Sequence, residues 1–312
     1  MPARIPIVVL AGSDSRPGPV PTQLEAEDML HGYKGAAPLP SGRSLVGELV
    51  ERFRAADRFE DPIVIGPRRV YEGHVDCEVV DVEGNLAITL ESVRELIRSR
   101  FDLSAPLALS TCDILPTGEE TQRLMAECYD PHAACSFWGQ LITAEPEQMG
   151  ASCWKPSYHF LPDVGQSPVN MYPGHLIIAR PGALRMRLTN HLLQLAYSHR
   201  NIELHKRRFR MIARGVGRLV AEDFQNLFAM QMPKLALSIP AACLSAYGKF
   251  RRGTLTVPQF ADYVSRVFLH REFRRRAQQG PSAVFSLTSI VSFAKDIDTK
   301  TELEEAAPPS DD

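Results

Sequence analysis

The feature that most constrains the fold is an alternation of short apolar runs and amphipathic segments in the first third of the chain. Compact runs of Val, Ile and Leu bounded by Gly, Pro or Asp are typical of buried strands. Segments 44–56 and 86–101 carry apolar residues at helical spacing, and Ser44 suits the N-cap of the first. The strand-like runs cover residues 5–12, 61–67, 77–84 and 105–113. Strands alternating with helices predict a mostly parallel sheet covered on both faces.

The fourth strand-like run, "APLALSTCD", ends on a carboxylate, Asp113, with Pro116 soon after. Ligands of such sheets bind outside the carboxyl ends of the strands. A carboxylate at this position therefore suggests that a cation binds there. The alternative is a structural role, in which Asp113 caps the turn before Pro116.

The second half of the chain changes character. The pattern is mostly helical from about residue 184 to 279, and "AVFSLTSIVSFAKDIDTKTELEEA" then predicts a strand, a turn and a helix start. Thr299 and Glu302 fit a capping box. We expect a core over 1–184, a large helical insertion over 185–280 before the last core strand, the returning strand and helix over 281–303, and a disordered acidic tail over 304–312.

Composition argues against several classes of protein. The formal net charge of −2 gives no case for a nucleic-acid binder. Six cysteines without a C-x-x-C pair argue against a zinc ribbon or a redox dithiol and suggest reduced thiols. The first residues lack the apolar core of a signal peptide, and no run reaches the roughly 18 apolar residues of a membrane span. We expect a cytoplasmic protein.

The loop after the first strand suits phosphate. Gly12 allows a sharp turn, and consecutive backbone N–H groups there could cradle phosphate oxygens. Lys34, in "HGYKGAAPL", could reach a triphosphate, although a lone lysine is otherwise a surface residue. Neither G-x-x-x-x-G-K-[ST] nor G-x-G-x-x-G occurs in the chain, which argues against a P-loop enzyme and a dinucleotide fold.

Taken in order, these segments resemble the MobA-like nucleotidyltransferases. The resemblance rests on "VVLAGS", "KGAAPLPSGRSLVGELVERF", "DPIVIGP", "EGNLAITLESV", "LALSTCDILPTG" and "DIDTKTEL". That family has a Gly-rich loop, a lysine before a turn, an Asp followed by an apolar residue and Pro, and a late "DxDTPEDL" segment. The resemblance implies a Rossmann-like sheet of GT-A/nucleotidyltransferase type and the Mg²⁺-dependent transfer of NMP from an NTP to a small, phosphorylated acceptor with release of pyrophosphate.

The resemblance also implies roles for particular residues. Lys34 and Asp113 would be catalytic, and Asp113 would share the metal with Asp298, with Asp296 as the competing choice. A solvated turn with a helix cap is the alternative for these last two carboxylates. The nucleotide-binding set would comprise Ala11, Gly12, Ser13, Arg16, Lys34, Gly84 and Asn85.

The chain departs from the family pattern in its glycine-rich loop and its late acidic segment. Ser13 stands where the second glycine is expected, Arg16 is displaced by one position, and "TKTE" replaces "TPED". These departures leave a noncatalytic nucleotide-binding relative as one alternative. A GT-A glycosyltransferase that uses a sugar nucleotide is the other.

The acceptor side carries fewer signals. Lys155 and Tyr158 match a basic-x-x-Tyr pattern of the family and are candidate acceptor-binding residues. A basic run over 200–218 suits either a solvated helix face or contact with a phosphorylated acceptor or an anionic lipid surface. The expected partners are thus an NTP and a small acceptor. We assign no metal to the histidines of this region, which lack the i, i+4 spacing of a helical metal pair: His191, His199 and His205.

Overall fold

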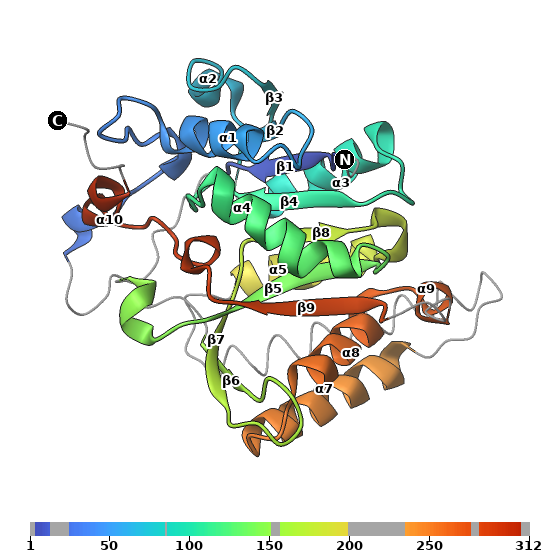
Figure 1. Cartoon of the computed structure of the whole chain (residues 1–312). Helices are drawn as coiled ribbons and strands as arrows, with labels where there is room; N and C mark the ends of the chain where they lie inside the picture. Colours follow the sequence, from blue (N-terminus) through green and yellow to red (C-terminus); the bar gives the residue numbers. More distant parts are fainter. Residues whose placement is uncertain are drawn as a thin grey trace.

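The computed structural model describes residues 4–12, 25–84, 86–150, 157–198, 235–275 and 281–306. Within these ranges the chain forms a nine-stranded sheet with helices on both faces (Figure 1). The strands are β1 (Ile7–Leu10), β2 (Ile63–Gly66), β3 (Glu78–Asp81), β4 (Leu107–Thr111), β5 (Phe137–Thr143), β6 (Tyr158–Phe160), β7 (Val169–Pro173), β8 (Leu176–Ala179) and β9 (Ala283–Thr288).

The helices follow the predicted alternation in the first half of the chain and dominate from residue 186 onward. They are α1 (Leu45–Ala55), α2 (Arg68–Tyr71), α3 (Leu86–Arg100), α4 (Gly118–Leu124), α5 (Met186–Ser198), α7 (Leu235–Arg251), α8 (Val257–Phe268), α9 (Arg271–Arg275) and α10 (Lys300–Glu305). Ser44 caps α1 as expected, by accepting a hydrogen bond from the Gly47 N–H.

The sheet has the order β3-β2-β1-β4-β8-β5-β7-β6, with β9 also paired to β5. Strands β1 to β4 are mutually parallel, and β9 is parallel to β5. Only β8 and β7 run against the other described strands, because each pairs antiparallel with its neighbours. The prediction of a mostly parallel α/β sheet is therefore confirmed, although the sequence did not reveal the reversed strand β8 in its middle.

Each face of the sheet has its own core. On one face, α1 and α4 bury Leu49, Phe53 and Leu124 together with Trp138 of β5. On the other face, α3 packs Val93, Leu96 and Ile97 against β1, β2 and β4. Because apolar groups cover both faces, the surface of the sheet that can bind a ligand lies at the ends of its strands.

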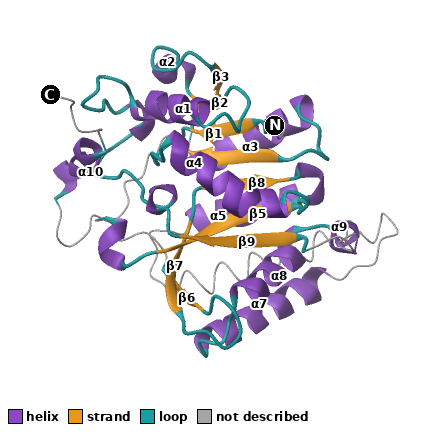
Figure 2. Ribbon diagram, in the orientation of Figure 1, coloured by secondary structure: helices purple, strands orange, loops and turns teal. Residues whose placement is uncertain are grey.

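Two of the described helices before β9, α7 and α8, lie on the β9 side of the sheet, whereas α5 lies beside its first half. Helix α8 lies against both α7 and β9, and α5 lies against α3 (Figure 2). Thr299 and Glu302 form the predicted capping box at the start of α10, which extends through Glu305 into the expected tail. Among the described residues, no helix has both the length and the hydropathy that a membrane crossing requires.

Candidate functional site

The carboxyl ends of the parallel strands bring the predicted nucleotide loop together. Ala11 and Gly12 follow β1, and Gly84 follows β3 at the same edge of the sheet. A Cβ on Gly12 would lie 2.9 Å from Thr89 Oγ1 and 3.8 Å from the Gly84 carbonyl oxygen. The backbone at Gly12 thus approaches the start of α3 closely, which is a physical reason for glycine at this position.

Asp113 lies two residues beyond the end of β4, at this same edge. The Asp113 carbonyl oxygen accepts a hydrogen bond of 2.8 Å from the Ile297 N–H. This contact brings the late acidic segment, which includes Asp296 and Asp298, beside a residue more than 180 positions earlier in the chain. The predicted meeting of these distant segments is therefore present in the structure.

Asp113 and Asp296 form a cluster with His175. One candidate ligand atom from each of the three side chains lies within 4.8 Å of those of the other two. His175 Nε2 is 2.7 Å from Asp296 Oδ1, and His175 Nδ1 is 4.0 Å from Asp113 Oδ1. The three side chains are 14 to 24% exposed, so the cluster is partly shielded but open to solvent. Two carboxylates and an imidazole form a donor set that can hold a divalent cation.

The surroundings of Asp113 favour the ionised form of its carboxyl group. Burial by itself would raise the pKa of its carboxyl, but His175, a hydrogen bond from Thr111 and the charge of Lys34 together lower that pKa below its ordinary value. Its Oδ1 is buried and accepts no hydrogen bond from the described residues. A buried anionic oxygen without a donor is costly unless a cation or water satisfies it.

A bulge in the sheet places His175. Strands β7 and β8 both pair with β5: Pro173 of β7 lies opposite Leu141, and Ile178 of β8 lies opposite Trp138. The two residues on β5 are three positions apart, whereas their partners are five positions apart. The two extra residues include His175, whose N–H leaves the ladder and donates to the Phe293 carbonyl oxygen at 2.8 Å. Bulges commonly re-aim a side chain beside a functional site.

Gly174 makes this bulge possible. Its N–H donates to the Gln140 carbonyl oxygen at 3.0 Å, and a Cβ at this position would overlap the Gln140 side chain. Sequence reasoning missed His175, because "YPGHLIIARP" matched the family pattern only loosely. The available signal was a glycine and a lone polar residue immediately before an apolar strand.

Lys34 and Asp298 form a separate ion pair. Lys34 lies in a 3₁₀ turn (Lys34–Ala36), and its Nζ is 2.5 Å from Asp298 Oδ1. The exposed fractions of the two side chains are 23% and 8%. Burial would lower the pKa of Lys34, but the adjacent Asp298 and the more distant charges of Asp113 and Asp296 raise it above its ordinary value. Asp298 was the first choice as the second metal ligand, but its carboxylate contacts the ammonium group of Lys34. Asp296, the competing choice, lies in the cluster with Asp113 and His175.

The remaining predicted residues fall into two groups. Tyr158 lies on β6, where it stacks on Phe160 and meets the edge of Phe250 rather than the carboxylates. Its packing in this aromatic cluster explains the raised pKa of its hydroxyl. Several predicted residues lie outside the described part of the chain: Ser13, Arg16, Asn85, Lys155, and the basic run 200–218 with His199 and His205.

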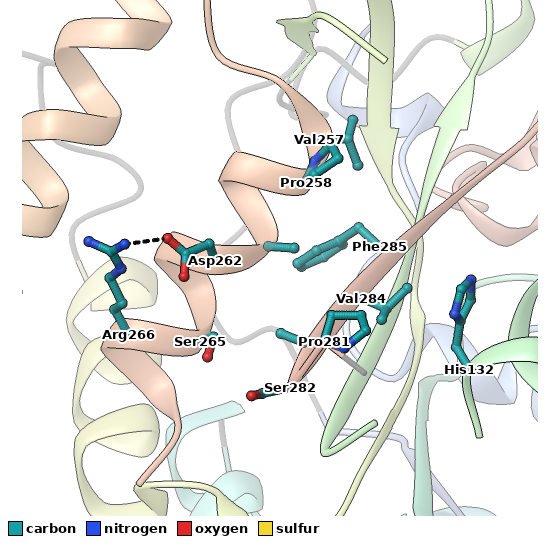
Figure 3. A pocket seen from close by; sticks show the side chains of 12 residues that line it. His132, Val257, Pro258, Asp262, Ser265, Arg266, Pro281, Ser282, Val284 and Phe285 are labelled. Carbon is teal, nitrogen blue, oxygen red and sulfur yellow. Dashed lines mark ion pairs between the residues drawn. The ribbon is translucent and has the colours of Figure 1, made fainter. Parts of the chain in front are cut away.

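A pocket of about 540 Å³ lies elsewhere, between α8 and β9 (Figure 3). Its walls are largely apolar, with Val257, Pro258 and Phe285 among them, and its charged side chains Asp262 and Arg266 pair with each other at 2.7 Å. No residue of the glycine loop or of the acidic cluster lines it. The pocket therefore belongs to the packing of the helical region and not to the candidate site.

No protein-family model matches the sequence, and no curated protein matches it. Among solved structures, the chain is similar to a hypothetical transferase from Thermus thermophilus, at 18% identity and a TM-score of 0.50, over 96% of this chain and all of the other. It also matches CMP:2-keto-3-deoxy-manno-octonic acid synthetase complexed with CTP, at 10% identity and a TM-score of 0.40 (69% and 86% covered).

A third match is 4-diphosphocytidyl-2C-methyl-D-erythritol synthase, at 10% identity and a TM-score of 0.37, over 62% of this chain and 79% of the other. Of these three, the transferase from Thermus thermophilus is the most similar in shape, and at 18% identity the likeness concerns the fold alone. It agrees with the pairing of strands described above: the chain is a mixed α/β protein with a mostly parallel central sheet.

Proposed function

We propose that this protein is a nucleotidyltransferase of the MobA-like kind, which transfers NMP from an NTP to a small, phosphorylated acceptor and releases pyrophosphate. One observation carries the proposal. At the carboxyl edge of the parallel strands, a glycine loop, a lysine and two clustered carboxylates lie together. This combination suits nucleotidyl transfer, in which the protein mainly positions phosphates and offsets their charge.

The roles of the residues follow from their chemistry. Gly12 and its neighbours would cradle the phosphates with backbone N–H groups. Lys34 would offset the charge on the triphosphate, after exchanging its contact with Asp298 for phosphate oxygens. Gly84, which lies beside Gly12, would contact the nucleoside side of the substrate.

Asp113 and Asp296 are the residues that would hold a divalent ion. The buried Asp113 Oδ1 without a hydrogen-bond donor supports this assignment. The resemblance to the MobA-like family implies Mg²⁺, which often uses one or two carboxylates together with phosphates and water. When bound, such an ion neutralises charge on the phosphates and the leaving pyrophosphate.

We also propose the domain division stated above, with residues 1–184 and 281–303 as the core.

The proposal is tested by ligand binding followed by product analysis. Each NTP, with and without a divalent ion, should raise the melting temperature if it binds the native state. Asp113→Asn should remove the metal-dependent part of the shift. Asp61→Asn, a control at the amino end of β2, should keep it.

Product analysis separates the alternatives. Pyrophosphate released from an NTP in the presence of a sugar phosphate or a similar acceptor supports nucleotidyl transfer. Release of a nucleoside diphosphate from a sugar nucleotide would instead indicate the glycosyltransferase. Saturable binding without turnover on any acceptor would indicate a noncatalytic relative, and the proposal would then be wrong.

A further inference from the structure

The acidic cluster contains a nitrogen donor that neither the proposed reaction nor the family resemblance requires. The structure orients the His175 ring from both sides. Its Nδ1 lies 3.0 Å from Thr111 Oγ1, and its Nε2 lies 2.7 Å from Asp296 Oδ1. Its backbone is held by the bulge and by the bond to Phe293. The ring is thus fixed in orientation, and one of its nitrogens lies within 4.8 Å of a carboxylate oxygen of both Asp113 and Asp296.

The donor set bears on the kind of ion. Mg²⁺ takes oxygen ligands in near-ideal octahedral geometry, whereas imidazole suits first-row transition ions. We infer that Asp113, His175 and Asp296 hold a divalent first-row transition ion, with His175 as a direct nitrogen ligand, in place of Mg²⁺. The inference deepens the proposed function by naming the ion class of its site, and in that respect it rests on that function.

Two further observations support a cation at this point. Asp113 Oδ1 is buried and has no hydrogen-bond donor among the described residues, although it faces His175 Nδ1 at 4.0 Å. His175 Nδ1 is engaged by Thr111 Oγ1, which leaves Nε2 as the ligand nitrogen. The 2.7 Å between Nε2 and Asp296 Oδ1 suits adjacent positions on one ion whose bonds are each about 2 Å long. Lys34 contacts Asp298, so the ammonium group of Lys34 does not occupy the space between Asp113 and His175.

The competing role for His175 is that of a positioning residue. In that case the imidazole would only donate a hydrogen bond to Asp296, and the two carboxylates alone would bind the ion. The two roles differ in a spectroscopic signature. A nitrogen bonded directly to Mn²⁺ modulates the electron spin echo of the ion, whereas a nitrogen in the outer shell does not give that coupling.

The test uses the full chain stripped of metal and loaded with Mn²⁺, first alone and then with pyrophosphate as a source of phosphate oxygens. We expect saturable binding and a directly coordinated ¹⁴N signal in the wild type. His175→Asn offers an oxygen donor of similar size, so it should lose the ¹⁴N signal and weaken Mn²⁺ binding at least about tenfold. Mg²⁺ should displace Mn²⁺ from this variant at a concentration at least about tenfold lower than from the wild type.

His74→Asn is the matched control. His74 is exposed and lies in the loop before β3, beside Gly47 of α1, and it is not part of the Asp113–His175–Asp296 cluster, so this variant should behave as the wild type. Near-UV circular dichroism verifies that both variants are folded. Three results would each overturn the inference: bound Mn²⁺ without the ¹⁴N signal, equal Mn²⁺ affinity in His175→Asn and the wild type, or no saturable Mn²⁺ binding with or without pyrophosphate.

The outcome is separable from that of the proposed function. Mn²⁺ binding through His175 without pyrophosphate release from any NTP would support the metal site and contradict nucleotidyl transfer. Nucleotidyl transfer with Mg²⁺, together with no ¹⁴N signal from bound Mn²⁺, would support the proposed function and contradict the metal site with His175 as a ligand.

Discussion

Asp296 and Asp298 stand two positions apart in the chain, yet their carboxylates have different surroundings. Asp298 is almost buried and pairs with the ammonium group of Lys34 at 2.5 Å. Asp296 is somewhat more exposed and faces His175, within reach of Asp113. A short acidic motif thus supplies both an internal ion pair with Lys34 and a carboxylate of a cluster that could hold a cation.

The largest expected effect is a loss of divalent-ion affinity when the cluster that contains Asp296 loses its other carboxylate. Asp113→Asn keeps the size of the side chain but removes the anionic charge that faces His175 and Asp296. Divalent-ion affinity, measured by calorimetry, should fall by more than about 100-fold, because changes behind the ligands alone already cost 10- to 100-fold. An affinity within about threefold of the wild type would show that the ion binds elsewhere.

The next effect concerns the Lys34–Asp298 pair. Lys34→Met leaves a buried carboxylate without its partner, and we expect the free energy of unfolding to fall by about 2 kcal/mol, a figure reduced because Lys34 is partly exposed. Adding Asp298→Asn should recover part of this loss in a denaturant titration. The exposed Lys300→Met is the control, and it should change stability by less than about 0.5 kcal/mol.

If Lys34→Met and Lys300→Met destabilised the protein equally, the ion pair would have no special role. Metal affinity distinguishes the Lys34–Asp298 pair from the Asp113–His175–Asp296 cluster. Without nucleotide, Lys34→Met should leave it within severalfold of the wild type, since Lys34 contacts Asp298 and not Asp296.

A third variant tests the bulge. Gly174→Ala places a methyl group against the Gln140 side chain, which must shift together with the strand that carries His175. Overpacking of this kind costs about 1–3 kcal/mol, and the displaced ring should weaken metal binding by about tenfold. Gly73→Ala, where nothing lies near the added methyl group, is the matched control. Unchanged metal affinity in Gly174→Ala would separate the bulge from the site.

The smallest expected effect is a pH dependence of the stabilisation that the Lys34–Asp298 pair provides. The folded state raises the pKa of Lys34 above its unfolded value of about 10.4. The corresponding stabilisation is therefore fully present below pH 10.4 and is lost as the pH rises through the folded-state pKa. The difference in unfolding free energy between wild type and Lys34→Met should stay constant from neutral pH to about 10 and shrink above it. A difference that shrank below about pH 9 would contradict the assignment.

Much of the fold could be predicted because the relevant signals are local. Apolar runs bounded by Gly and Pro marked the parallel strands, and caps at Ser44 and Thr299 marked two helix starts. The position of Asp113 followed from one topological rule, that the carboxyl ends of parallel strands share an edge. The meeting of Asp113 with the late acidic segment came from the family resemblance, and a backbone hydrogen bond from Ile297 establishes it.

The rest depends on contacts between segments that are distant in the chain. The different surroundings of Asp296 and Asp298 depend on which side chain Lys34 reaches, and Lys34 is more than 260 residues away. His175 enters the cluster because two extra residues interrupt the pairing of β7 and β8 with β5. A bulge of this kind leaves only a glycine and a lone polar residue as its trace in the sequence, and these two residues predict neither its presence nor its direction.

The most direct measurement is anomalous diffraction at the manganese edge, from crystals grown with Mn²⁺ and a nonhydrolysable NTP analogue. We expect one peak within bonding distance of Asp113, His175 and Asp296, with Asp298 outside that distance and phosphate oxygens of the analogue completing the shell. A peak bonded to Asp298 instead of Asp296, or no peak beside Asp113, would contradict this assignment.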